Sequence, residues 1–308
     1  MRSGEFPTGA RDTSLVESGL AAALAEGLGS TVASAAPLRG GDVAESYRVE
    51  LADGRRVFAK THRRAPPGFF TTESVSLSWL REPGVVAVPE VLLVSDGDPG
   101  AGVPNHLVLE WVDEGHGVRS GPTEAALGVA LAELHEVGAP SFGREDRRTT
   151  GSRGLPNEPC DTWVEFYATQ RLLPLARLAR DGGSLPASAL RGLEEVAGRL
   201  DVVGGPPEPP ARLHGDLWAG NRLVDVAGRS WLIDPAAHGG HREYDLAMMR
   251  LFGGFGDACF VAYAERRPLA EGWQERVELH QIAPLVVHAI KFGGGYVGAA
   301  SRAIERYR

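Results

Sequence analysis

The first 112 residues alternate between helical and extended patterns. Apolar side chains recur at helical spacing in two segments, and the second of these stops before Pro83. Side chains alternate in polarity on both sides of an Asp53-Gly54 turn, which predicts a β-hairpin. The expected elements are helices at 13–27 and 69–81 and strands at 46–51, 56–60, 90–95 and 106–112. This order favours an antiparallel sheet and disfavours a doubly wound nucleotide-binding fold.

A second, mainly helical region begins at Pro122. A stretch rich in Gly, Arg and Pro at 141–159 interrupts it. Further helices are expected at about 161–180, 187–200, 243–252 and 273–290, and short strands at 222–225 and 230–233. The chain is therefore expected to be an α+β protein with a domain boundary near 113–121. We expect a flexible tail at 1–12, an N-terminal lobe at 13–115 and a C-terminal lobe at 116–308.

Composition narrows the classes of function. The 308 residues are 43% hydrophobic, which is enough for a large core, and the net charge of −8 disfavours binding to nucleic acid or to an anionic membrane. Only two cysteines occur, Cys160 and Cys259, and the N-terminus lacks the basic and apolar pattern of a signal peptide. We therefore expect a cytoplasmic protein with no disulfide framework and no membrane span. A monomer is favoured, and the sequence leaves the oligomeric state open.

The most informative segment is LHGDLWAGN at 213–221, followed by WLIDP at 231–235. Asp216 precedes Asn221 by five residues, and Asp234 ends the next expected strand. Protein kinases place a catalytic Asp, an Asn and a metal-binding Asp in this order. Asp216 would orient an acceptor hydroxyl and accept its proton, while Asn221 and Asp234 would hold Mg²⁺ on the nucleotide phosphates. The spacing of Asp216 and Asn221 is weak evidence by itself, and HGD at 214–216 alone also fits an Asx turn before a strand.

The N-terminal region offers the other parts of a kinase in the expected order. Gly40 and Gly41 lie between two expected strands, where a backbone without Cβ can approach phosphates. Lys60 ends the next strand and Glu73 lies on the following helix, as in the kinase pair that holds the α- and β-phosphates of ATP. Taken singly, the glycines also fit an ordinary turn, and the two charges fit a solvated surface.

The strand at 106–112 runs into the polar link between the two lobes. A kinase binds adenine at this place, and we expect main-chain groups of Glu110 and Val112 to do so. A buried strand without a ligand is the alternative.

Several motifs together resemble those of the fructosamine kinase family, also called ketosamine-3-kinases. They are GGD at 40–42, YR at 47–48, VFAK at 57–60, HGDLWAGN at 214–221, IDPA at 233–236, GHREYDLA at 240–247 and FGGF at 252–255. This family is related to the aminoglycoside phosphotransferases, which usually have His where this chain has Trp218 and which lack the FGGF motif. The resemblance implies a protein-kinase-like bilobal fold, with an antiparallel sheet in the N-lobe and a mainly helical C-lobe.

The resemblance also implies an activity. Such kinases use ATP and Mg²⁺ to phosphorylate the sugar 3-hydroxyl of ketosamines, the Amadori products of sugars with amines, and so act in deglycation of small molecules or proteins. Trp218, His288 and Tyr296 would line the acceptor, whereas His214 and Asp245 would support the catalytic loop. Trp218 could instead be a core aromatic residue and His288 a hydrogen-bonded core histidine. Phosphorylation of another hydroxyl, as in an aminoglycoside, and an inactive nucleotide-binding scaffold are the alternative functions.

Two further histidines have the appearance of a metal pair. His238 and His241 flank two glycines, but the nearby sequence supplies no third ligand. We expect no zinc site there.

Overall fold

The computed structural model describes residues 18–38, 44–62, 65–97, 102–115, 120–145, 149–150 and 154–308. The predicted tail at 1–12 and the predicted phosphate-binding residues Gly40 and Gly41 lie outside these ranges. The chain divides into two compact units. The first consists of Met1–Val75 and Pro89–Val112, and the second of Ser76–Val88 and Asp113–Arg308. The assignment of nucleotide-binding and catalytic lobes to these units stays a prediction.

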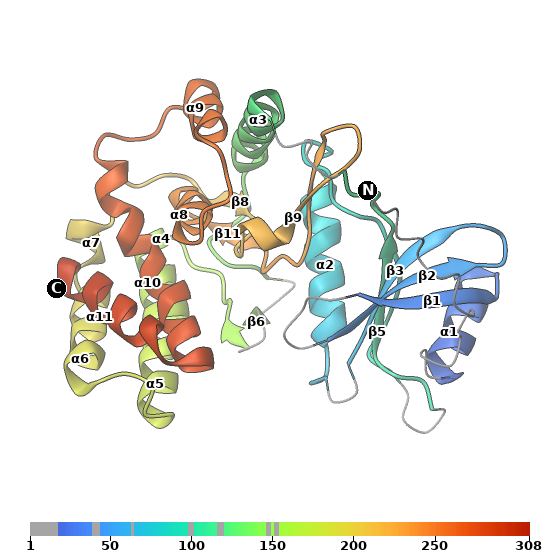
Figure 1. The fold of residues 1–308 in the computed structure, drawn as a ribbon. Coiled ribbons are helices and arrows are strands. Elements are labelled where there is room, and N and C mark those ends of the chain that lie inside the picture. The colour runs from blue at the N-terminus through green and yellow to red at the C-terminus, as the bar shows by residue number, and fades with distance from the viewer. Residues whose placement is uncertain are drawn as a thin grey trace, which may run out of the picture. The chain divides into compact units, whose positions relative to one another are not determined.

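The first unit is built on an antiparallel sheet of five strands in the order β1-β2-β3-β5-β4 (Figure 1). The strands are β1 (Val32–Leu38), β2 (Glu45–Leu51), β3 (Arg56–Thr61), β4 (Val91–Ser95) and β5 (His106–Glu110). Helix α1 (Ser18–Leu28) buries Leu20 and Leu24 against one face of this sheet, next to Val49 and Val57. The predicted hairpin is confirmed, and its strands alternate between buried and more exposed side chains because only one face is covered by α1.

The sequence implied a strand before Gly40 without giving its bounds, and β1 lies there. Its sequence, VASAAPL, holds three alanines and a proline, which are depleted in strands. The strand lies at the edge of the sheet, where the missing N–H of Pro37 is tolerated. Helix α2 (Phe69–Arg81) has the bounds that the sequence predicted.

The second unit is mainly helical. Its helices are α3 (Gly121–Val137), α4 (Trp163–Phe166), the π-helical segment η2 (Tyr167–Leu172), α5 (Leu173–Asp181), α6 (Ala187–Ala197), α7 (Leu200–Val203), α8 (Glu243–Leu251), α9 (Asp257–Arg266), α10 (Trp273–Phe292) and α11 (Gly295–Tyr307). Helices α5, α6, α10 and α11 pack around one apolar core, and α3 pairs with α9 (Figure 1). The single helix expected at 161–180 is thus three joined segments.

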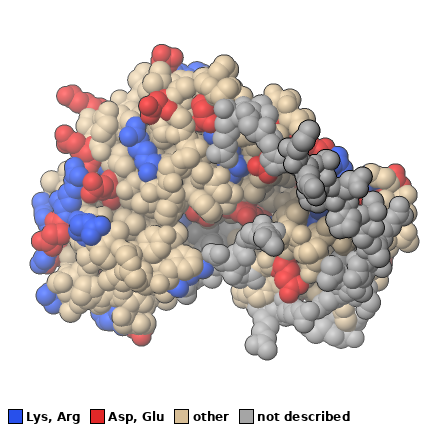
Figure 2. Space-filling view, viewed as in Figure 1, with Lys and Arg blue, Asp and Glu red and all other residues tan. Residues whose placement is uncertain are grey.

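Two of these helices escaped the sequence analysis, α9 and α11. The buried side of α11 consists of Ala300, Ala303, Ile304 and Tyr307, and alanines give only a weak apolar signal. Within the described residues, no helix is long and apolar enough to cross a membrane. On the face drawn in Figure 2, acidic and basic side chains of the described residues are interspersed rather than gathered by sign.

Three short antiparallel strand pairs lie in the second unit. They are β6 (Thr149–Thr150) with β7 (Leu155–Pro156), β8 (Ala211–Leu213) with β11 (His238–Gly240), and β9 (Arg222–Val224) with β10 (Ser230–Leu232). The pair β9–β10 matches the two strands expected there to within one residue. The pair β8–β11 is only three residues long, too short for a pattern in the sequence, yet it carries the segment with the kinase-like motif.

Candidate active site

The segment with the kinase-like motif is a tight loop between β8 and β9. It leaves β8 at His214, passes through Asp216 and Trp218, and closes in the 3-10 turn η3 (Ala219–Asn221). Gly215 has a φ of 80°, and a Cβ there would collide with the carbonyl oxygen of Ala236. Only glycine fits this position, because both the left-handed backbone and the close approach exclude a side chain.

The loop is anchored from beneath by Asp245, in the first turn of α8. Its Oδ2 accepts the His214 N–H at 2.7 Å, and its Oδ1 accepts the Gly215 N–H at 2.9 Å. His135 of α3 lies with Nε2 3.3 Å from Oδ2. Burial alone would raise the pKa of Asp245, but the His135 contact and the other hydrogen bonds outweigh it and hold the pKa below its usual value. Asp245 therefore fixes the loop as a buried, ionised acceptor, as its predicted supporting role requires.

His214 connects the loop to the next segment. Its Nε2 lies 2.9 Å from the Ile233 carbonyl, and its Nδ1 lies 3.3 Å from the Asp216 N–H. Burial lowers the pKa of His214, so the ring is neutral. The tautomer with hydrogen on Nε2 satisfies both contacts, donating to Ile233 and accepting from Asp216.

Asn221 brings the two predicted chemical aspartates together. Its Nδ2 donates to Asp216 Oδ2 at 3.0 Å and to the Asp216 carbonyl at 2.8 Å, and lies 3.4 Å from the Asp234 carbonyl. Asp234 has a φ of 52° and is the only non-glycine residue with positive φ in the described ranges. Such backbone strain is concentrated at functional sites. The bare Asx turn considered from the sequence does not account for this three-residue arrangement.

The donor set suits a hard divalent cation. Every side-chain hydrogen bond found for Asn221 uses Nδ2, so none of these bonds engages Oδ1. Carboxylate oxygens of Asp216 and Asp234 lie on the same loop pair. Oxygen ligands from carboxylates and amides are those that Mg²⁺ prefers, so the residues fit the predicted metal.

Asp216 is tuned toward neutral pH. Burial raises its pKa to about 6, and the nearby charges of Asp234 and Asp245 act in the same direction. The hydrogen bond from Asn221 and the charge of Lys291 oppose the rise. A carboxylate with a pKa near the working pH can accept a proton and release it again, which is what a general base needs.

The predicted acceptor residues meet in an aromatic cluster, which we define as Trp218, Phe252, His288, Phe292 and Tyr296. Trp218 and Phe252 meet edge to face at 6.0 Å between ring centroids, and the Phe252 and His288 rings are 5.0 Å apart. His288 in turn lies 5.0 Å from Tyr296. Trp218 is 40% exposed and Phe292 51% exposed, so Trp218 is not the core aromatic residue of the alternative interpretation. His288 Nδ1 donates to the Pro284 carbonyl at 2.8 Å, and the ring also contacts Phe252 and Tyr296 of the cluster.

Phe252 and Lys291 were not among the predicted site residues. Phe252 belongs to the FGGF motif, and this loop packs on the catalytic loop: Gly254 has a φ of 87°, and a Cβ there would clash with Ala219. Lys291 lies one turn after His288 on α10, with Nζ 4.7 Å from the Phe292 ring centroid. The rarity of lysine could have drawn attention to Lys291, because Lys60 is the only other lysine in the chain.

In the first unit, Lys60 and Glu73 form an ion pair with Nζ and Oε1 2.7 Å apart. Their side chains are only 11% and 15% exposed, so they are not the solvated charges of the alternative interpretation. The amide of Glu110 donates to the Glu90 carbonyl at 2.9 Å, so this amide is already used within the first unit. Val112 is nearly buried. The roles of these residues in binding ATP stay predictions.

The histidine pair considered from the sequence is not brought together as a metal site. His238 bonds the Ala236 carbonyl, whereas His241 lies with Glu243 and His280 in a buried group whose candidate ligand atoms are within 4.8 Å of one another. Arg276 already forms two hydrogen bonds with the Glu243 carboxylate, at 2.6 and 2.9 Å. Its positive charge opposes a second cation beside that carboxylate. The two cysteines are buried and unpaired.

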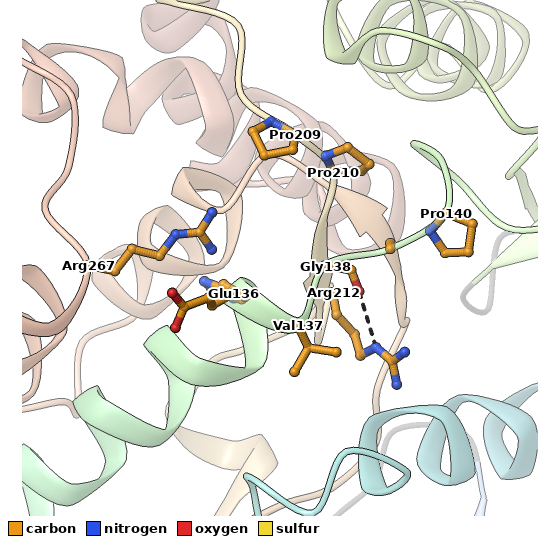
Figure 3. A pocket seen from close by; sticks show the side chains of 10 residues that line it. Glu136, Val137, Gly138, Pro140, Pro209, Pro210, Arg212 and Arg267 are labelled. Atoms are coloured by element: carbon orange, nitrogen blue, oxygen red, sulfur yellow. Dashed lines mark hydrogen bonds between the residues drawn. The ribbon is translucent and has the colours of Figure 1, made fainter.

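A separate pocket of about 450 Å³ opens near the end of α3 (Figure 3). Pro209, Pro210, Arg212 and Arg267 are among its lining residues, and Arg212 bonds the Gly138 carbonyl there. None of the predicted site residues lines it. The pocket is therefore not the candidate active site.

Known proteins resemble this chain over nearly its whole length. The family model described as fructosamine kinase matches residues 18–308. A crystal structure from Thermobifida fusca, titled "putative fructosamine-3-kinase", is 40% identical, covers 97% of this chain and 99% of its own, and superposes with a TM-score of 0.84. The "Protein-ribulosamine 3-kinase, chloroplastic" of Arabidopsis thaliana is 31% identical over 288 residues, which are 92% of this chain and 85% of that protein.

More distant structures share the fold alone. An aminoglycoside phosphotransferase is 15% identical and has a TM-score of 0.58 over 93% of this chain and 96% of its own. The α+β, kinase-like fold class expected from the sequence is thus confirmed. The match of the family model across all described residues shows that this chain belongs to the fructosamine kinase family.

Proposed function

We propose that this protein transfers the γ-phosphoryl group of ATP to the 3-hydroxyl of ketosamines. One observation carries the proposal: Asn221 Nδ2 contacts both the Asp216 carboxylate, at 3.0 Å, and the Asp234 main-chain carbonyl, at 3.4 Å, so the proposed proton acceptor and the proposed metal-binding residue lie on neighbouring loops. The names of the relatives, which refer to fructosamine and ribulosamine, support ketosamines as the acceptors. Phosphorylation at this hydroxyl gives an unstable 3-phosphate from which the amine is recovered, so the role is deglycation.

In the second unit, Asp216 acts as the base. Its carboxylate orients the sugar hydroxyl and takes its proton as the oxygen attacks the γ-phosphorus, while the bond from that phosphorus to the β-γ bridging oxygen breaks and ADP leaves. His214 and Asp245 hold the loop so that Asp216 does not have to be positioned during the reaction.

Asn221 and Asp234 would hold Mg²⁺ through their side-chain oxygens. When bound, the ion neutralises charge on the nucleotide phosphates. The left-handed backbone of Asp234 and the hydrogen bonds of Asn221 prepare these oxygens before a ligand arrives.

In the first unit, Glu73 would fix Lys60 for the α- and β-phosphates of ATP. The ion pair is shielded from water, so the ammonium group is held in one place rather than solvated. Gly40 and Gly41 stay predicted phosphate contacts, and Glu110 and Val112 stay predicted adenine contacts.

The aromatic cluster is the proposed acceptor site. Trp218 follows Asp216 by two residues and has an exposed ring. The rings of Phe252, His288 and Tyr296 extend the same aromatic cluster. Sugar rings present C–H groups to aromatic faces, and that contact would hold the sugar while its hydroxyl meets Asp216.

The test is ATP consumption by the purified protein with fructoselysine, ribuloselysine and kanamycin as parallel acceptors, with Mg²⁺ and after its removal by chelation. We expect Mg²⁺-dependent turnover on the ketosamines and a loss of at least about 10³-fold in kcat for Asp216→Asn, in which the amide cannot accept the proton. Asp257→Asn, an exposed change at the start of α9, is the matched control and should keep full turnover.

Turnover on kanamycin alone would move the acceptor to the aminoglycosides. Nucleotide-dependent thermal stabilisation without consumption of ATP on any acceptor would indicate an inactive nucleotide-binding protein. Unchanged turnover in Asp216→Asn would show that the base is another residue.

A further inference from the structure

Lysine is almost absent from this chain. Lys60 and Lys291 are the only two among 32 basic residues, and arginine occupies every other basic position. The first of them forms the buried ion pair with Glu73 at the predicted phosphate site. Lysine and arginine differ in chemistry, because the ammonium group is a compact point charge with three donors and the guanidinium is a broad planar fork.

The second lysine lies beside the proposed acceptor site. Lys291 is in the last turn of α10, three residues after His288 and next to Phe292, so it projects from the helix that supplies two members of the aromatic cluster. Its Nζ lies 4.7 Å from the Phe292 ring centroid. The side chain is exposed, and its charge reaches Asp216, where it favours the ionised carboxylate.

A local positive charge stands out against an acidic protein. The net charge of −8 repels anions at long range, so an anionic acceptor needs a nearby cation to bind. The phosphates of ATP already have a proposed partner in the first unit, Lys60. Lys291 instead accompanies the aromatic residues that would hold the sugar.

We propose that Lys291 binds a carboxylate on the amine half of the acceptor, so that ketosamines of amino acids are preferred to ketosamines of uncharged amines. The inference rests on the proposed function. In a ketosamine the nitrogen is attached to C1, near the reacting 3-hydroxyl, and an amino-acid carboxylate follows the nitrogen by one carbon. With the sugar against Trp218, a cation at the rim of the aromatic cluster is placed for that carboxylate rather than for the sugar.

The test compares two acceptors that differ only in this group, fructosylglycine and fructosylethanolamine. For the wild type we expect kcat/KM to favour fructosylglycine by about tenfold or more, the size of one charge-assisted hydrogen bond. Lys291→Met should bring the ratio close to one, and Lys291→Arg should restore only part of it, because the charge returns but the compact ammonium group does not. Arg177→Met, which removes an exposed cation from α5, is the matched control and should leave the ratio unchanged.

Two results would overturn the inference. A ratio that stays the same in Lys291→Met would show that the lysine does not contact the carboxylate. An equal fall of kcat for both acceptors, with the ratio retained, would show that the charge acts on the phosphoryl group instead. If the wild type turns over neither ketosamine, the proposed function is wrong and this inference fails with it. That outcome is distinct from the other two, because it is seen in the wild type before any substitution is compared.

Discussion

The catalytic loop is held by two regions of opposite character. Beneath it, Asp245 and His135 are fully buried and connected by hydrogen bonds of 2.7 to 3.3 Å to the loop backbone and to each other. Beside it, the aromatic cluster exposes Trp218 and Phe292 and meets through ring contacts alone. The buried anchor holds the loop that carries Asp216, whereas the cluster presents exposed rings beside that loop. Under the proposed function, position and acceptor choice are therefore assigned to different residues.

The two aspartates on this loop system show the same division. Both are removed from water to a large extent, yet the pKa of Asp245 is lowered and that of Asp216 is raised to about 6. Asp245 accepts hydrogen bonds from two backbone N–H groups, whereas the carboxylate of Asp216 accepts one from Asn221 and faces the charge of Asp234. The surroundings of Asp245 therefore stabilise its ionised form, whereas the surroundings of Asp216, the proposed base, destabilise its ionised form.

The largest expected effect comes from Asp245→Asn. The amide keeps the size of the side chain but turns one acceptor into a donor facing a backbone N–H, and it removes a buried charge that His135 and the loop compensate. We expect the free energy of unfolding to fall by about 3–5 kcal/mol, as for other broken buried charge networks. Urea denaturation measures the change, and Asp257→Asn at the exposed start of α9 should alter stability by less than about 1 kcal/mol.

If Asp245→Asn loses no more stability than the control Asp257→Asn, then Asp245 does not hold the catalytic loop in place. Activity alone does not decide this, because loss of the anchor and loss of the base both abolish turnover.

Asp216→Asn should act in the opposite direction. The pKa of Asp216 in the folded protein, about 6, is above the ordinary value of 3.8, so the folded state binds this proton more tightly than the unfolded state. Its contribution to stability is present at low pH and is lost as pH rises through about 6. At pH 8 the amide should therefore be more stable than the wild type, by about 1–2 kcal/mol after allowance for solvent screening. Thermal melts at pH 5 and pH 8 measure the difference.

The same titration sets the pH dependence of the reaction. The wild-type kcat/KM should fall about tenfold per pH unit below 6, because only the ionised carboxylate accepts the proton. A profile that is flat from pH 5 to 8, together with no gain in stability for Asp216→Asn, would contradict the assignment of Asp216 as a base with a raised pKa.

The anchor and the cluster also differ in how far the sequence reveals them. Asp216, Asn221 and Asp234 are recognisable because one short segment fixes their spacing, and Asp245 lies in the first turn of a helix with a clear pattern. The contact of His135 with Asp245 joins residues 110 positions apart, and no local pattern reports it. Phe252 was visible only as part of a motif, because its contact with Trp218 depends on how the loop after α8 packs on Ala219.

The elements show the same limit. Amphipathic helices such as α2 were predicted to the residue, while α11, which buries alanines, and the three-residue strands β8 and β11 were not. Short strands and alanine faces are stabilised by tertiary contacts rather than by their own sequence pattern, so only the folded chain shows them.

The smallest expected effect is that of Trp218→Ala. Its indole is 40% exposed and touches Phe252 only edge to face, so its removal should change the free energy of unfolding by less than about 1 kcal/mol. The KM for the ketosamine should rise about tenfold, since the sugar loses the aromatic face beside Asp216. Trp218→Phe keeps a flat ring and should recover most of the affinity. A large loss of stability in Trp218→Ala, with KM unchanged, would mean that the exposed cluster is a second structural anchor, and the division between position and acceptor choice would then be wrong.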